Sequence, residues 1–287
     1  MIERYDFNEV LSSLDDISQW LNSLGFTTPD RVRVYCRNIR KMIAVEASGG
    51  MEALQATIPF AAAREIFWSY IDADEFVRAV TALRNSLGDE AAAAPIEKAL
   101  NGPADLFLEN ENNSEGRNFM FELIIGGRLA AAGFRPSFNK GTDVHVEFEG
   151  LQVSIQCKRP LSMSGLEKNI MKAIHQLKAD KADLSLIAVS VSRLLNSGDP
   201  NSIPEVPHHE LGHSYLRTRI HEIALQTKRF WFGKMDRAGI LFYAFLPIRS
   251  YERPSCRFPE RYEGMCPMGS DEVTTALLKR FAQSMRA

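Results

Sequence analysis

The sequence has few cysteines, no long apolar run and no segment typical of a secretory signal. Its 287 residues include only four cysteines, none in a C-x-x-C pair, which argues against a zinc ribbon and a disulfide framework. No apolar run approaches the roughly 20 residues that a transmembrane helix needs. The first residues lack the basic segment and apolar run of a secretory signal. We therefore expect a protein of the reducing cytoplasm, with no membrane partner.

Neither sign of charge is in large excess. The formal net charge is −2, so binding to nucleic acid would require local basic patches rather than a basic surface overall. The composition, 45% hydrophobic and 24% charged, is that of an ordinary globular protein. The length fits one large domain or two smaller ones.

The first part of the chain has the apolar spacing of helices. Apolar residues recur at helical period, and turn residues separate the segments that we predict as helices: 6–24, a second helix opened by Pro29, 59–86 and 91–100. We predict an all-helical region over residues 1–103. Its expected role is to recognise a protein partner or the target.

The periodicity of the apolar residues changes in the second part, residues 104–287. Helical and strand patterns alternate there. The predicted order is a helix at 117–132, strands at 143–149 and 151–158, a helix at 166–178, a strand at 184–192, a helix at 207–228, a strand at 239–246 and a helix at 271–286. This order predicts an α/β fold with a mixed sheet flanked by helices.

The two adjacent strands can be paired residue by residue. Glu149-Gly150 is a plausible two-residue hairpin loop. The resulting register gives one apolar face and one polar face. The apolar pairs are Val144 with Ile155, Val146 with Val153 and Phe148 with Leu151; the polar pairs are Asp143 with Gln156, His145 with Ser154 and Glu147 with Gln152. Lys158 follows Gln156 on the polar face, so a carboxylate, an amide and an amine gather at the open end of the hairpin.

Such a group suits a divalent metal. Mg²⁺ prefers oxygen ligands and keeps several waters, so Asp143 and the backbone carbonyl of Cys157 are candidate ligands. Glu122 can supply a second carboxylate from the preceding apolar helix, where burying it unpaired would be costly. Glu115 is an alternative on the same helix. The competing interpretation is an ordinary hairpin with outward polar residues and a solvated Glu122.

These residues resemble the PD-(D/E)XK nuclease superfamily. The segment Gly141–Val144, followed by Ile155–Arg159, is most similar to Mrr-type restriction endonucleases, in which glutamine replaces the usual acidic residue. The resemblance covers about residues 114–192. It implies a restriction-endonuclease-like fold, Mg²⁺ or Mn²⁺ as cofactor, and an active site made of Glu122, Asp143, Gln156 and Lys158. It further implies an endonuclease acting on DNA, in restriction or defence, and a possible homodimer.

A second motif points to other chemistry. His209-Glu210-Leu211-Gly212-His213 matches H-E-x-x-H, which on a helix holds Zn²⁺ between two histidines with glutamate as general base. Against a zinc metallopeptidase, Pro207 would place this motif at the start of its helix. No third ligand stands out downstream.

Basic residues near the polar hairpin face are candidates for nucleic-acid contacts. Arg159 adjoins Lys158, and Lys168 and Lys172 share one face of the following helix. A solvated helix face explains the two lysines equally well. A non-catalytic relative of the nuclease fold that binds nucleic acid is therefore a further alternative.

Overall fold

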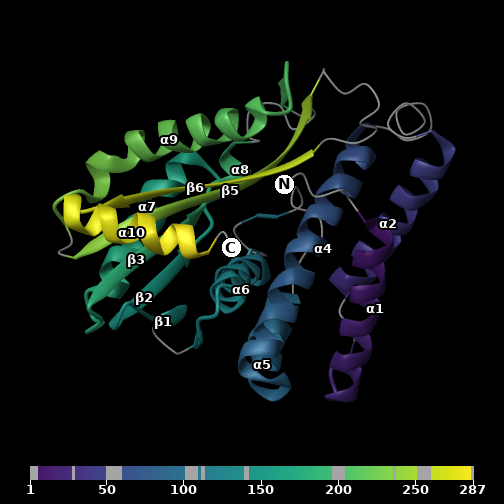
Figure 1. Ribbon diagram of the computed structural model, residues 1–287, viewed down its shortest axis with the longest axis horizontal. Coiled ribbons are helices and arrows are strands. Elements are labelled where there is room, and N and C mark those ends of the chain that lie inside the picture. Colours follow the sequence, from purple (N-terminus) through teal and green to yellow (C-terminus); the bar gives the residue numbers. More distant parts are fainter. Residues whose placement is uncertain are drawn as a thin grey trace.

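The N-terminal region consists of helices, as its apolar period predicts. The computed structural model describes residues 6–27, 30–49, 60–100, 109–110, 114–138, 142–195, 204–234, 237–250 and 260–285. Asp6 caps α1 (Phe7–Ser23) by accepting a hydrogen bond of 2.9 Å from the backbone N–H of Glu9. Helices α2 (Asp30–Ser48), α4 (Phe60–Leu87) and α5 (Asp89–Leu100) follow (Figure 1). The predicted helix start at Pro29 and the predicted boundary at residues 103/104 lie outside the described residues.

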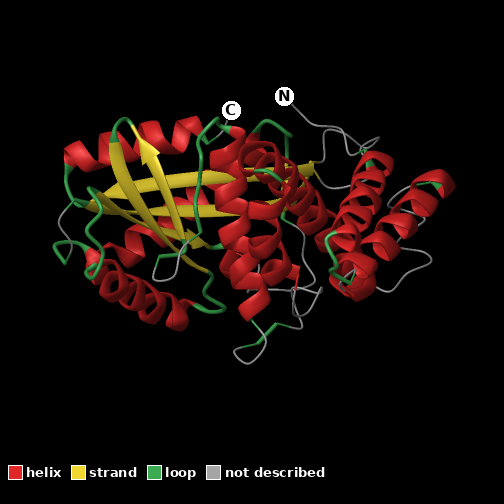
Figure 2. Ribbon diagram, turned by 90° about the horizontal axis from the view of Figure 1, so that it is seen from below, coloured by secondary structure: helices red, strands yellow, loops and turns green. Residues whose placement is uncertain are grey.

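The C-terminal part is a mixed sheet with helices on both faces, which confirms the predicted α/β class (Figures 1 and 2). The described strands have the order β1-β2-β3-β5-β4, and β6 pairs with β5. Their bounds are β1 Val144–Phe148, β2 Leu151–Lys158, β3 Leu184–Ser190, β4 Glu205–Val206, β5 Ala238–Ser250 and β6 Glu260–Gly269. The helices among them are α6 Glu115–Ala131, α7 Met163–Leu177, α8 Ser192–Leu195, α9 Leu211–Trp231 and α10 Glu272–Ser284.

The hairpin register is the one the sequence predicts. Val144 pairs with Ile155, Val146 with Val153 and Phe148 with Leu151, in an antiparallel ladder. The turn residues Glu149 and Gly150 have φ values of 51° and 77°, the left-handed conformation that a tight hairpin loop requires. The competing interpretation of an ordinary hairpin with outward polar residues does not hold at Ser154 and Gln156, because both are fully buried.

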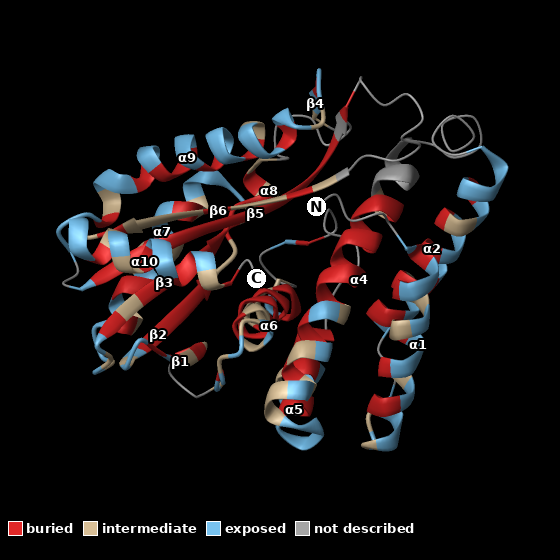
Figure 3. Cartoon of the chain, viewed as in Figure 1, coloured by how far each residue is buried: buried red, intermediate tan, exposed pale blue. Residues whose placement is uncertain are grey.

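Helices cover both faces of the sheet. Helices α7 and α9 pack on one face, where Gly264 of β6 leaves room for Ile220 of α9. Helices α6 and α10 pack on the other, where Phe121 contacts Tyr243 and Phe148 contacts Phe281. Strands buried on both sides have few positions open to solvent, as Figure 3 shows for the central strands. A functional site in this layer is therefore expected near the strand ends.

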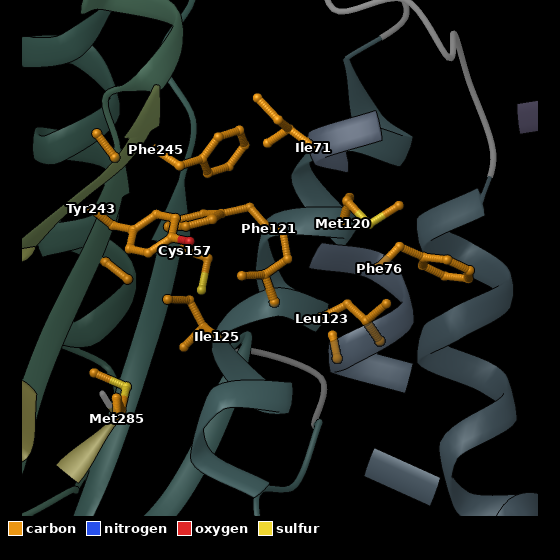
Figure 4. Packing of buried hydrophobic residues seen from close by; sticks show 14 of the residues in the cluster. Ile71, Phe76, Met120, Phe121, Leu123, Ile125, Cys157, Tyr243, Phe245 and Met285 are labelled. Atoms are coloured by element: carbon orange, nitrogen blue, oxygen red, sulfur yellow. The ribbon is translucent and has the colours of Figure 1, made fainter. Parts of the chain in front are cut away.

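Helix α6 lies between the sheet and the N-terminal helices. Phe121 and Ile125 point toward Cys157 and Tyr243 of the sheet, whereas Met120 and Leu123 point toward α4 (Figure 4). Gly127 permits close approach of the two helices, because a Cβ there would lie 2.4 Å from the Cα of Ala79. The helical region and the sheet thus share one continuous hydrophobic core.

Buried charges also join the two parts. Asp74 and Glu75 of α4 form ion pairs with Arg261 of β6. Glu75 also accepts hydrogen bonds of 3.0 Å from both Arg128 and Tyr243. Asp74, Glu75, Arg128 and Arg261 line a cleft of about 1210 Å³, whose lining includes none of the four predicted active-site residues. Because the charges already pair with one another, we assign this cluster a structural role.

None of the helices in the described ranges is both long enough and apolar enough to cross a bilayer.

Candidate active site

Asp143, Gln156 and Lys158 meet at the end of β2. The backbone N–H of Cys157 donates a hydrogen bond of 2.7 Å to Asp143 Oδ2. Lys158 Nζ donates one of 2.8 Å to Gln156 Oε1 and lies 3.6 Å from Asp143 Oδ2. The strand fixes the alternation of Gln156 and Lys158, and the hairpin turn brings Asp143 beside them. The structure therefore brings together the three residues that the register predicted.

Glu122 approaches this group from α6. Burial, and then the negative charge of Asp143, raise the pKa of Glu122 to about 8, against the opposing positive charges of Lys158 and Lys98. Glu115, the alternative carboxylate, is exposed in the first turn of α6. Glu122 is thus the carboxylate of this helix that interacts with the hairpin residues.

The donor set fits a divalent cation. Two partly buried carboxylates lie here with one adjacent ammonium, and the pKa of Glu122 is raised first by burial and then by the charge of Asp143. The described residues contain no group of three or more His, Cys, Asp or Glu side chains placed to hold a metal. Mg²⁺ commonly takes one or two carboxylates and keeps its waters, so Asp143 and Glu122 would be the side-chain ligands for it. Coordination of the metal by the backbone carbonyl of Cys157 stays a prediction.

The shifted pKa of Glu122 predicts a pH dependence of stability. Its ordinary value is 4.5, so between pH 4.5 and about 8 the folded protein holds a proton that the unfolded chain releases. The free energy of unfolding should therefore fall as pH rises through this window, by up to about 1.4 kcal/mol per pH unit. Thermal melts in EDTA at pH 5 and pH 8 should show Glu122→Gln gaining stability relative to wild type at the higher pH.

The exposed Glu147 of β1 supplies the matched control. Glu147→Gln should follow the wild-type curve at both pH values. Mg²⁺ should stabilise wild type at pH 8 more than Glu122→Gln, since the cation replaces the proton. Equal pH dependence in all three proteins would contradict the assignment of Glu122 to the site.

A second set of hydrogen-bonded polar residues includes Thr142, the residue before Asp143. Asp180, in the loop after α7, accepts hydrogen bonds from the hydroxyls of Thr142 at 2.5 Å and Ser154 at 2.8 Å. Burial alone would raise the pKa of Asp180, but these bonds hold it below its ordinary value. Ser154 Oγ also lies 3.0 Å from His145 Nδ1. No sequence pattern marks Asp180, because it lies in a polar loop without periodicity.

Arg159 does not have the exposure that a phosphate contact needs. Its guanidinium forms an ion pair with Glu109, and the two side chains are 8% and 0% exposed. The expectation of a nucleic-acid contact at Arg159 is therefore corrected: burial of an arginine demands a carboxylate partner, and Glu109 provides it. Lys168 and Lys172 are exposed on α7, as the sequence pattern suggested. Their contact with nucleic acid stays a prediction.

The H-E-x-x-H segment does not adopt the geometry of a zinc protease site. Helix α9 begins at Leu211, so His209 and Glu210 precede it, and no described group of three or more His, Cys, Asp or Glu side chains is placed to hold a metal. Tyr262 donates a hydrogen bond of 2.8 Å to the backbone carbonyl of His209, and its ring contacts His213 edge-on. Gly212 admits that ring, since a Cβ there would lie 2.3 Å from it. The motif serves packing between α9 and β6.

No family model, no curated protein and no solved structure matches this chain significantly. The case for function therefore depends on the chemistry of the residues gathered around β2.

Proposed function

We propose that the chain is a metal-dependent endonuclease that hydrolyses phosphodiester bonds, with DNA as its expected substrate. The observation that carries the proposal is the contact of Lys158 with Asp143 and Gln156 beside the partly buried Glu122. The combination of two carboxylates, an amide and an ammonium is the one that the PD-(D/E)XK resemblance implies. The hairpin, the helix α7 and the parallel strand β3 follow in the order that this resemblance leads us to expect.

Each side chain has a role in the proposed reaction. Asp143 and Glu122 would hold Mg²⁺ or Mn²⁺, which polarises a phosphoryl oxygen and lowers the pKa of bound water. The Lys158 ammonium stabilises negative charge that develops on the phosphate in the transition state. Gln156, which is fully buried, accepts a hydrogen bond from Lys158 and so orients it. Burial near β2 keeps these groups in a medium where their charges interact strongly.

The resemblance also supports a biological setting. A role in restriction or defence and assembly as a homodimer belong to the proposal on that ground alone. A zinc peptidase is not part of it, because His209 and Glu210 precede α9 and no third ligand joins them among the described residues. A non-catalytic nucleic-acid-binding relative of the fold is distinguished from an enzyme by the following test.

The test is cleavage of plasmid and linear DNA by wild type and Asp143→Asn, with Mg²⁺, with Mn²⁺ and with EDTA. Wild type should cut with either metal and not with EDTA, and Asp143→Asn should not cut. Asparagine retains an oxygen that can accept the hydrogen bond from Cys157 but loses the charge that a metal ligand needs. Cutting by Asp143→Asn would place the site elsewhere. DNA binding without cutting by wild type would indicate the non-catalytic relative.

A further inference from the structure

The last turn of α5 places a lysine of the helical region beside the candidate site. Lys98 Nζ lies 5.6 Å from the centroid of the Phe119 ring on α6. Phe119 precedes Glu122 by three residues, so the two side chains share one face of that helix. The positive charge of Lys98 also acts on Glu122, in the same sense as that of Lys158. Two ammonium groups, one from each part of the chain, thus lie near the same carboxylate.

The backbone that carries Lys98 is held firmly, whereas its ammonium is open to solvent. Ile96, Ala99 and Leu100 of α5 are buried, and the carbonyl of Ala99 accepts a hydrogen bond of 2.5 Å from the buried Arg31. Lys98 itself is exposed. No ion pair of Lys98 with another described residue is found, whereas Lys158 is engaged by Gln156 and Asp143. The donors of Lys98 are therefore accessible to a ligand.

We propose that Lys98 contacts a backbone phosphate of the nucleic-acid substrate, so that the N-terminal helical region forms part of the substrate-binding surface. Lysine binds phosphate as a compact charge on a flexible stem, which suits an exposed position at the edge of a site. The inference rests on the proposed function for the identity of the substrate. It gives the helical region a direct role in binding, at a residue that the sequence pattern did not single out.

A structural role for Lys98 is the competing explanation. A lysine in the last turn of a helix stabilises the helix dipole, typically by about 0.3–1 kcal/mol. That role predicts a lower melting temperature for Lys98→Gln and no change in DNA binding. The phosphate contact predicts weaker DNA binding by Lys98→Gln and an unchanged melting temperature.

The experiment measures equilibrium binding of a short fluorescent DNA duplex in EDTA, over salt from about 50 to 200 mM. The proteins are wild type, Lys98→Gln, Lys98→Arg and the control Lys41→Gln, which alters an exposed lysine of α2. We expect weaker binding by Lys98→Gln and a plot of log K against log salt that is less steep by about 0.9, the value for one lost phosphate contact. Lys98→Arg and Lys41→Gln should keep the wild-type slope.

Each outcome is decisive. An unchanged slope in Lys98→Gln overturns the contact, even where wild type cuts DNA and the proposed function stands. A reduced slope in a protein that never cuts supports the contact while the endonuclease proposal fails. Wild type that neither binds nor cuts DNA overturns both.

Discussion

A Lys158→Met variant is expected to lose DNA cleavage by about 10²–10³-fold, the usual effect of removing one preorganised group that stabilises transition-state charge. Methionine is close to lysine in length and fills the space of its stem. The side chain is only 11% exposed, so its aliphatic part contributes to packing that methionine can replace. What the variant lacks is the ammonium beside Asp143 and Gln156.

The measurement is the single-turnover cleavage rate at saturating Mg²⁺. Lys279→Met is the matched control, since Lys279 is exposed and lies on helix α10 rather than on strand β2. It should cut at the wild-type rate. Loss of Lys158 also removes a charge that lowers the pKa of Glu122, so titration of Glu122 in Lys158→Met should move to higher pH. Wild-type rates in Lys158→Met would refute the role given to this lysine.

Asp72→Asn is expected to lower the free energy of unfolding by about 3–5 kcal/mol, the cost of leaving a buried ion-pair partner alone. Arg117 Nη1 lies 2.6 Å from Asp72 Oδ2, and the two side chains are 3% and 7% exposed. The substitution keeps the shape of the side chain but removes the negative charge that lies beside the buried guanidinium of Arg117.

Urea unfolding supplies the measurement, and Glu149→Gln supplies the control. Glu149 pairs with Arg280 at 2.7 Å, but these side chains are 44% and 52% exposed. Loss of such a solvated pair should lower the free energy of unfolding far less than Asp72→Asn does. Similar losses in both variants would contradict the importance given to burial. A double variant, Asp72→Asn with Arg117→Met, should recover part of the loss because it removes the stranded charge.

The buried pairs tie the helical region to the candidate site. Asp72 lies on α4 and Arg117 on α6, five positions before Glu122. Glu109, in the segment between the helical region and α6, pairs with Arg159, the residue after Lys158. The helical region is thus part of the scaffold that positions α6 and the end of β2. Recognition of a separate protein partner by its outer helices stays a prediction.

The hairpin and the group of residues at its open end could be predicted from local sequence patterns alone. Strand alternation has a period of two, and a two-residue loop fixes the register, so Val144–Ile155 and Val146–Val153 follow from local rules. The same rules place Asp143 near Gln156 and Lys158. The helices of the first 100 residues follow equally from their apolar period. These features depend on residues that are close together in the chain, so the sequence pattern can predict them.

Which side chains from distant parts of the chain join this group could be seen only in the tertiary structure. Nothing in the local pattern distinguishes Arg159, which is buried against Glu109, from Lys98, which is exposed beside Phe119. Strand β6 was not predicted, and its Tyr262 determines how the segment around His209 packs. Such contacts depend on how helices and sheet pack against one another, because burial and pairing of a charge are set by neighbours that lie far away in sequence.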